Sequence, residues 1–206
     1  MRKTLSISFI ILLIAFGCKK NNESPDTGSK DTFQPVTKGS YWKYDGLSKG
    51  TVFSTITMTG ATMTLNGRTY YEHKTVLEQL GTESAGYFSS ENGEVRTSAG
   101  NNESLFLKEN AAIGETWIAL IADGSSSGPV YQEPYRVIGK IVEKGINYTV
   151  AGKTYTNVIH TKHVRQYSSG ATSDLYDYYI AKGVGMIERK NPDGSSSTAL
   201  LEYSVK

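Results

Sequence analysis

The sequence has one cysteine, five prolines and three histidines among its 206 residues. A single cysteine cannot form an internal disulfide, so the fold must be stable without one. The charge is nearly balanced, with 22 basic and 20 acidic side chains. Because there is no basic excess to neutralise phosphates, nucleic acid is not an expected partner.

Long apolar runs are also scarce, and the only marked one lies at the N-terminus. The basic segment Met1–Lys3 precedes an apolar stretch from Ile7 to Phe16, and Gly17 and Cys18 follow it. The stretch is too short for a membrane-spanning helix, which needs about 20 residues. A basic start, a short apolar run and a small residue are typical of a secretory signal.

The segment Ala15–Cys18 resembles a bacterial lipobox. The resemblance implies a signal peptide over residues 1–17 and, on Cys18, a thioether-linked diacylglycerol and an N-linked acyl chain. Each buried methylene contributes about 0.8 kcal/mol, so several chains would hold the protein firmly in a membrane. In such lipoproteins, an Asp directly after the cysteine often causes retention in the inner membrane. Lys19 occupies that position here, and the absence of Asp resembles the pattern of lipoproteins sorted to the outer membrane. Periplasmic and outward-facing orientations both stay open.

The mature chain is expected to consist of a tether and one domain. Loss of Arg2 and Lys3 with the signal takes the basic count from 22 to 20, equal to the acidic count. Residues 18–32 carry the lipidated cysteine and a polar segment that reads as a flexible tether. We expect a single folded domain over residues 33–206.

The composition of the rest of the chain predicts β-strands, since its 14 tyrosines and many Thr and Val residues suit a pleated surface. Asn66-Gly67 and Asn92-Gly93 are strong hairpin signals, and Ala151-Gly152 is another tight turn. In the strand after Gly67, Tyr71 and His73 fall on the face that we expect to be buried. The predicted strands cover residues 41–44, 51–59, 61–65, 68–76, 86–91, 94–98, 104–108, 116–121, 131–142, 147–150, 155–167, 175–181, 185–190 and 199–205.

Short strands joined by short turns predict an all-β single domain. We expect an antiparallel meander that forms a strongly twisted half-barrel or barrel, with a two-sheet sandwich as the alternative. Helical periodicity is weak throughout the chain.

Three fragments resemble a group of uncharacterised Bacteroidota lipoproteins: Pro35–Tyr44 with G-x-Y-W-x-Y, Ile113–Trp117 with G-E-T-W, and Tyr178–Glu188 with Y-x-A-x-G-V-G-x-I. The resemblance implies an extended antiparallel sheet, similar to the half-barrels of lipoprotein carriers, and brings no established activity. Gly183 and Gly185 predict a bulge or sharp bend.

Patterns that carry chemistry are weak. Ser126 lies centrally in a G-x-S-x-G pattern, but a nucleophile elbow needs a following helix, and Pro129 and a strand follow here. His160 and His163 fall on opposite faces of a strand, which does not favour a shared metal ion. We therefore expect no enzyme, no metal site and no cofactor.

Aromatic side chains are the best candidates for ligand contacts. On residues 175–180, Tyr176 and Tyr178 share one face and Tyr179 lies on the other. We expect a non-enzymatic, lipid-anchored envelope protein, anchored in the membrane through Cys18, that binds an apolar or lipid-like ligand or a protein partner. A surface glycan-binding lipoprotein and a structural subunit of an outer-membrane complex are the alternatives. The candidate ligand-binding residues are Trp42, Tyr71, Trp117, Tyr176 and Tyr178.

Overall fold

The computed structural model describes residues 31–46, 49–100, 102–124 and 133–206, which contain no helix. The predictions for the signal peptide, Cys18, most of the tether and Ser126 lie outside these residues. The strands are β1 (Tyr41–Asp45), β2 (Val52–Leu65), β3 (Arg68–Leu77), β4 (Thr82–Glu91), β5 (Glu94–Ala99), β6 (Asn102–Lys108), β7 (Thr116–Ala122), β8 (Tyr135–Val150), β9 (Lys153–Tyr167), β10 (Thr172–Ala181), β11 (Gly185–Lys190) and β12 (Ser196–Ser204).

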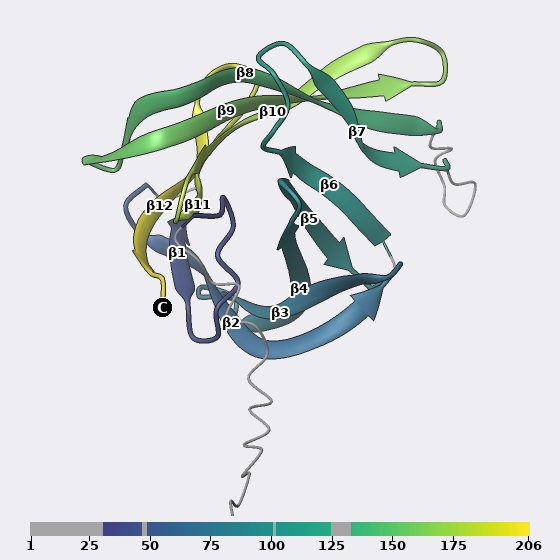
Figure 1. Cartoon of the computed structure of the whole chain (residues 1–206). Helices are drawn as coiled ribbons and strands as arrows, with labels where there is room; N and C mark the ends of the chain where they lie inside the picture. The colour runs from purple at the N-terminus through teal and green to yellow at the C-terminus, as the bar shows by residue number, and fades with distance from the viewer. Residues whose placement is uncertain (1–30, 47–48, 101, 125–132) are drawn as a thin grey trace, which may run out of the picture.

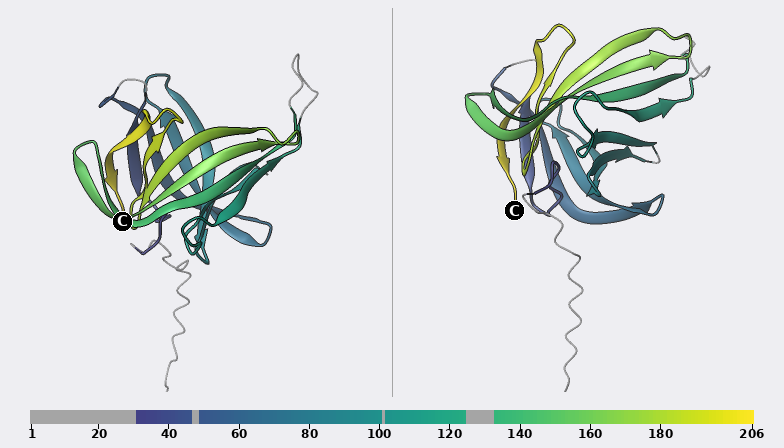
Figure 2. Two further views of the ribbon diagram at one scale, coloured as in Figure 1. Left: turned by 90° about the horizontal axis from the view of Figure 1, so that it is seen from above. Right: turned by 45° about the horizontal axis from the view of Figure 1, so that its top comes forward.

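The strands form one antiparallel sheet in the order β6-β5-β4-β3-β2-β1-β12-β11-β10-β9-β8-β7. Figure 1 shows β7–β10 above β2–β6, with β1, β11 and β12 joining the two layers at one side. Two further views show the same curled sheet (Figure 2). The predicted all-β antiparallel meander is confirmed, and it takes the form of a nearly closed barrel whose two edges, β6 and β7, are consecutive in the chain.

The predicted hairpin turns are confirmed. Asn66 and Gly67 have φ angles of 51° and 75°, and Asn92 and Gly93 have 56° and 75°. Positive φ at both central residues suits the right-handed twist of the flanking strands, and Asn and Gly tolerate it best. Ala151 adopts the same conformation at 47°, which is less favourable for a residue with a Cβ.

Two strands are longer than the sequence predicts. β2 continues through Gly60, and β8 continues through Gly145, where the prediction ends one strand and begins another. Both glycines have positive φ, and the register shifts between Met58 and Thr62 and again near Ile146. The interruptions are therefore bulges, which bend a strand without ending it.

The predicted alternation of buried and exposed side chains on β3 is also partly wrong. Tyr70, on the face expected to be exposed, is 0 % exposed, and its hydroxyl donates to Glu103 of β6. β3 and β6 are three strands apart in the sheet order, but the sheet curls so strongly that β6 covers Tyr70. Both faces of β3 are thus partly covered, which a single alternating pattern does not reveal.

The first core cluster joins two of the three sequence fragments. Trp42 of β1 is buried, and its indole N–H donates to the carbonyl of Val184 at 2.5 Å. Tyr44 donates to the carbonyl of Met186 at 2.9 Å. Gly185, with φ 104°, leaves room beside the Trp42 indole nitrogen. The G-V-G fragment is therefore a turn between β10 and β11, held against β1 across β12.

The second core cluster contains the seam between β6 and β7, which are not paired by a backbone ladder. The Trp117 indole N–H donates to the carbonyl of Leu105 at 2.9 Å, and the Ser104 hydroxyl donates to the carbonyl of Ala119 at 3.0 Å. A Cβ at Gly139 would lie 2.4 Å from the Trp117 ring. Only glycine on β8 therefore lets the indole lie flat enough to reach β6.

Gly139→Ala tests this contact. We expect a loss of about 1–3 kcal/mol in the free energy of unfolding, because the new methyl overlaps the indole ring. Trp117→Phe should also destabilise, since it leaves the Leu105 carbonyl without its buried donor. Urea unfolding of both single variants and the double variant gives their coupling. The cost of Gly139→Ala should fall in the Trp117→Phe background, and an equal cost in both backgrounds would contradict the contact.

His163 lies on the other side of Gly139 from Trp117, because β8 pairs with β7 and β9 at this position. The His163 ring is 6 % exposed, with ring centroids 6.0 Å from Trp117 and 4.9 Å from Tyr178. Burial lowers the pKa of His163 to about 4, although its hydrogen bond to the backbone of Phe106 acts in the opposite direction. The histidine is therefore neutral inside the core at pH 7.

This burial predicts a pH dependence of stability. The unfolded chain protonates His163 near pH 6.5, and the folded chain does so only near 4, so stability falls as the pH drops through this interval. Each unit of pKa difference corresponds to about 1.4 kcal/mol. His163→Phe should lose less stability than the unmodified protein between pH 7 and pH 4.5 in urea unfolding. Identical losses would mean that His163 is not responsible.

Candidate functional site

Both tryptophans predicted as ligand contacts lie in the core. Trp42 is 1 % exposed and Trp117 is 7 % exposed, and the two belong to different core clusters. Each indole N–H already has a carbonyl partner. The structure therefore uses both side chains to hold strands together, and Trp117 also lines a hollow between β7, β8 and β9.

The three predicted tyrosines are also separated. Tyr71 packs against the first cluster and Tyr178 against the second, where its ring meets Phe106 edge-on at 5.0 Å. Tyr176 shares the face of Tyr178 and lies under the guanidinium of Arg189, 4.6 Å from the ring centroid. The five predicted residues consequently do not form one site.

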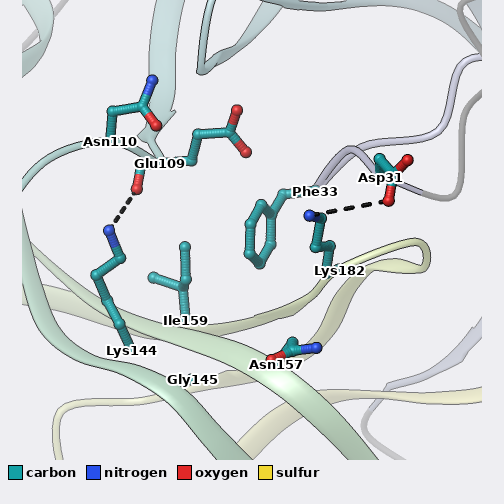
Figure 3. Close-up of a pocket in the computed structure, with 9 residues that line it drawn as sticks. All are labelled: Asp31, Phe33, Glu109, Asn110, Lys144, Gly145, Asn157, Ile159 and Lys182. Carbon is teal, nitrogen blue, oxygen red and sulfur yellow. Dashed lines mark hydrogen bonds and ion pairs between the residues drawn. The ribbon is translucent and has the colours of Figure 1, made fainter.

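A hollow of about 500 Å³ lies between Phe33 near the start of the domain, the segment after β6, and strands β8 and β9; Figure 3 shows the residues that line it. Its two ammonium groups already have partners. Lys144 donates to the carbonyls of Glu109 and Ala111 at 2.6 and 3.1 Å, and Lys182 lies 3.9 Å from Asp31. We interpret it as a junction between loops. The lining residues are Asp31, Phe33, Glu109, Asn110, Lys144, Gly145, Asn157, Ile159 and Lys182.

The best candidate site is an apolar groove on the outer face of β7, β8 and β9. On this part of the sheet, Trp117, Gly139 and His163 form a row that faces the core, and Ile118, Ile138 and Val164 form the adjacent row that faces away. Two hollows of about 460 and 580 Å³ adjoin there. We call them the outer groove; its lining includes Thr116, Ile118, Ile121, Ala122, Pro134, Tyr135, Arg136, Ile138, Lys140, Val164, Gln166, Tyr167 and Thr172.

Two of the four large apolar side chains that are exposed in the described residues lie together at this groove, whereas the other two, Leu80 and Ile113, lie outside it. Ile118 is 48 % exposed and Ile121 is 67 % exposed, both on the edge strand β7. Apolar side chains gathered beside a hollow in this way mark a contact surface more often than a scattered exposed residue does. The groove is therefore suited to an apolar chain or surface.

The rim of the groove is basic. Arg136 donates from Nε to Gln166 at 2.8 Å, and neither Arg136 nor Lys140 forms an ion pair with any described carboxylate. Asp123 lies at the far end of the hollow. An apolar floor beside uncompensated cations favours the acyl chain of an anionic amphiphile over a neutral apolar ligand.

Apart from Trp117, which lines one of the two hollows, the residues of this groove were not predicted from the sequence. Residues 117–122 read Trp-Ile-Ala-Leu-Ile-Ala, with apolar side chains at every position. In an antiparallel strand with one solvated face, polar residues are expected at alternate positions. The missing alternation in β7 was the signal that its outer face also meets an apolar partner.

Other chemistry in the described residues is limited. No group of three or more His, Cys, Asp or Glu side chains placed to hold a metal ion is found in them. His160 and His163 lie on opposite faces, as predicted. His160 contacts Glu143 at 3.1 Å and Asp177 at 2.6 Å and stacks on Tyr179, whereas His163 faces Trp117.

Comparisons with known proteins leave the chain without a family. No protein-family model matches the sequence, and no curated protein is significantly similar to it. One solved structure that resembles it is a candidate exported protein with a YmcC-like fold from Bacteroides fragilis NCTC 9343. The identity is 10 % and the TM-score 0.44, over 84 % of this chain and 99 % of that one. Similarity at this level bears on neither ligand nor partner.

In the part of the chain that the structure describes, no helix is long and apolar enough to cross a bilayer.

Proposed function

We propose that the chain is a lipid-anchored protein of the cell envelope, at the outer membrane, that binds an apolar or lipid-like ligand without transforming it. The outer groove holds the apolar part of that ligand. The observation that carries the proposal is the exposure of Ile118 and Ile121 beside Arg136 and Lys140.

The ligand is held on the surface of the sheet. The side chains of the two core clusters pack inside the curled sheet. The two hollows of the outer groove, in contrast, are open to solvent. An open groove binds an acyl chain along its length, where each buried methylene contributes about 0.8 kcal/mol. The carboxylate or phosphate at the end of the chain then lies near Lys140 or Arg136.

The proposed lipid anchor also favours binding of an amphiphile. A protein tethered through Cys18 by residues 19–30 stays close to the membrane surface, so amphiphiles in that membrane reach it at a high effective concentration. Even a shallow groove of modest intrinsic affinity is then occupied. The alternative of glycan binding has one specific support, the arginine and tyrosine side chains on the opposite face of β9.

Ile121→Asp tests the groove. The variant should bind a dansylated fatty acid at least tenfold more weakly, because burying a charge beside the acyl chain is unfavourable. Fluorescence titration of protein carrying Cys18→Ala, which has no acyl chain of its own, gives the Kd.

Leu80→Asp is the matched control, since Leu80 is 66 % exposed and does not line the groove. Its Kd should be unchanged. Equal weakening by Ile121→Asp and Leu80→Asp would remove the groove as the site. Lys140→Gln should weaken binding of the free acid more than binding of its methyl ester.

Cys18→Ala tests the anchor. In cells, the variant should move from the membrane fraction to the soluble envelope fraction and should no longer incorporate an alkyne-labelled fatty acid. Lys19→Gln keeps the cysteine and should stay in the membrane fraction. Membrane retention of Cys18→Ala together with continued labelling would refute lipidation at this residue.

A further inference from the structure

The inner face of β8–β11 carries a cluster of arginine and tyrosine side chains that the proposed function does not use. Strand register places its members on one face: Tyr135 pairs with Tyr167, Tyr176 with His163, and Tyr178 with Arg189. His163 and Tyr178 of this face both contact Phe106 of β6. We call Tyr135, Arg165, Tyr167, Tyr176 and Arg189 the arginine–tyrosine cluster.

Both arginines of the cluster rest on aromatic rings. The guanidinium carbon of Arg165 lies 4.5 Å from the ring centroid of Tyr135 and 5.9 Å from that of Tyr167. Arg189 lies 4.6 Å from the ring centroid of Tyr176. Stacking on the tyrosine rings fixes the planes of both guanidinium groups.

The hydrogen-bond partners of these arginines are all neutral. Arg165 donates to the Tyr167 hydroxyl at 3.3 Å, and Arg189 donates to Ser197 and Thr198 at 3.0 and 3.2 Å. Among the described residues, no carboxylate forms an ion pair with either one. The contrast with Arg68 and Arg96 is clear, because each of those arginines contacts at least two glutamates.

Unpaired polar atoms gather on the same face. Six buried side-chain nitrogen or oxygen atoms in the described residues have no hydrogen-bond partner, and they include Nε of Arg165, Nε of Arg189, Nε2 of His163 and Oγ1 of Thr161. Three of these residues occupy alternate positions of β9, namely Thr161, His163 and Arg165. Arg189 lies on the same face, because Tyr178 pairs with Thr161 on one side and with Arg189 on the other. Buried polar atoms in folded proteins usually have partners, so their grouping on one face sets this part of the sheet apart.

We infer that the arginine–tyrosine cluster binds an anion, and that the ligand is an acidic saccharide. A carboxylate is matched by a guanidinium group, whose planar N–H groups can donate two parallel hydrogen bonds. Tyrosine rings offer an apolar face and a hydroxyl, which together suit the faces and hydroxyls of a sugar ring. The inner face is therefore a second ligand site, which adjoins the outer groove at Tyr135 and Tyr167, since both side chains also line that groove.

Calorimetric titration of the full chain with tetragalacturonate tests the inference, with neutral maltotetraose and inorganic phosphate as comparison probes. The unmodified protein should bind tetragalacturonate and not maltotetraose. Arg165→Gln and Arg189→Gln should each weaken tetragalacturonate binding at least tenfold. Lys162→Gln is the matched control, because it removes a cation from the opposite face of β9, where Lys162 pairs with Asp174. It should bind tetragalacturonate normally.

Circular dichroism of each variant confirms the β-sheet fold before titration, and Tyr176→Phe provides a milder change that keeps the ring. It should retain most of the affinity if the ring supplies the contact. Equal binding of maltotetraose, or no binding of tetragalacturonate by the unmodified protein, would overturn the inference. Phosphate binding as tight as that of tetragalacturonate would overturn the assignment of a saccharide.

Discussion

The seam between β6 and β7 is the contact on which the rest of the structure depends. These strands are consecutive in the chain but lie at opposite edges of the sheet, with no ladder between them. The Trp117 indole and the Ser104 hydroxyl replace the ladder with bonds to backbone carbonyls. This side-chain closure seals the second core cluster, and it leaves β7 with a backbone partner on one side only. The outer groove lies where that strand's second face is uncovered.

Local features of the fold were predictable from the sequence because each one depends on only a few residues. Asn66-Gly67 and Asn92-Gly93 specify their turns through backbone conformation alone. The bulges at Gly60 and Gly145 were not predictable, since a glycine inside a strand pattern looks the same whether the strand ends or bends. The pairing of β1 with β12 joins residues more than 150 positions apart, and no local pattern indicates it.

The candidate sites were less predictable than the fold. Trp42 and Trp117 are large aromatic residues suited equally to a core and to a ligand, and only their carbonyl partners decide between the two. Arg165 and Arg189 are 24 positions apart, and the register of three strands brings them to one face of the sheet. The sequence did single out Tyr176, on which Arg189 stacks, but the lack of a carboxylate partner for the two arginines becomes visible only in three dimensions.

The two faces of β9 thus differ in chemistry: apolar with a basic rim outside, aromatic and cationic inside. The proposed function requires that an acyl chain lies on the outer face and does not enter the core. Paramagnetic broadening of NMR signals by spin-labelled stearate, added to protein carrying Cys18→Ala, distinguishes these two locations. The methyl signals of Ile118, Ile121 and Ile138 should broaden first, while those of Leu107 and Ile180 in the second core cluster should stay sharp. Broadening concentrated at Leu107 and Ile180 would show instead that the ligand enters the interior.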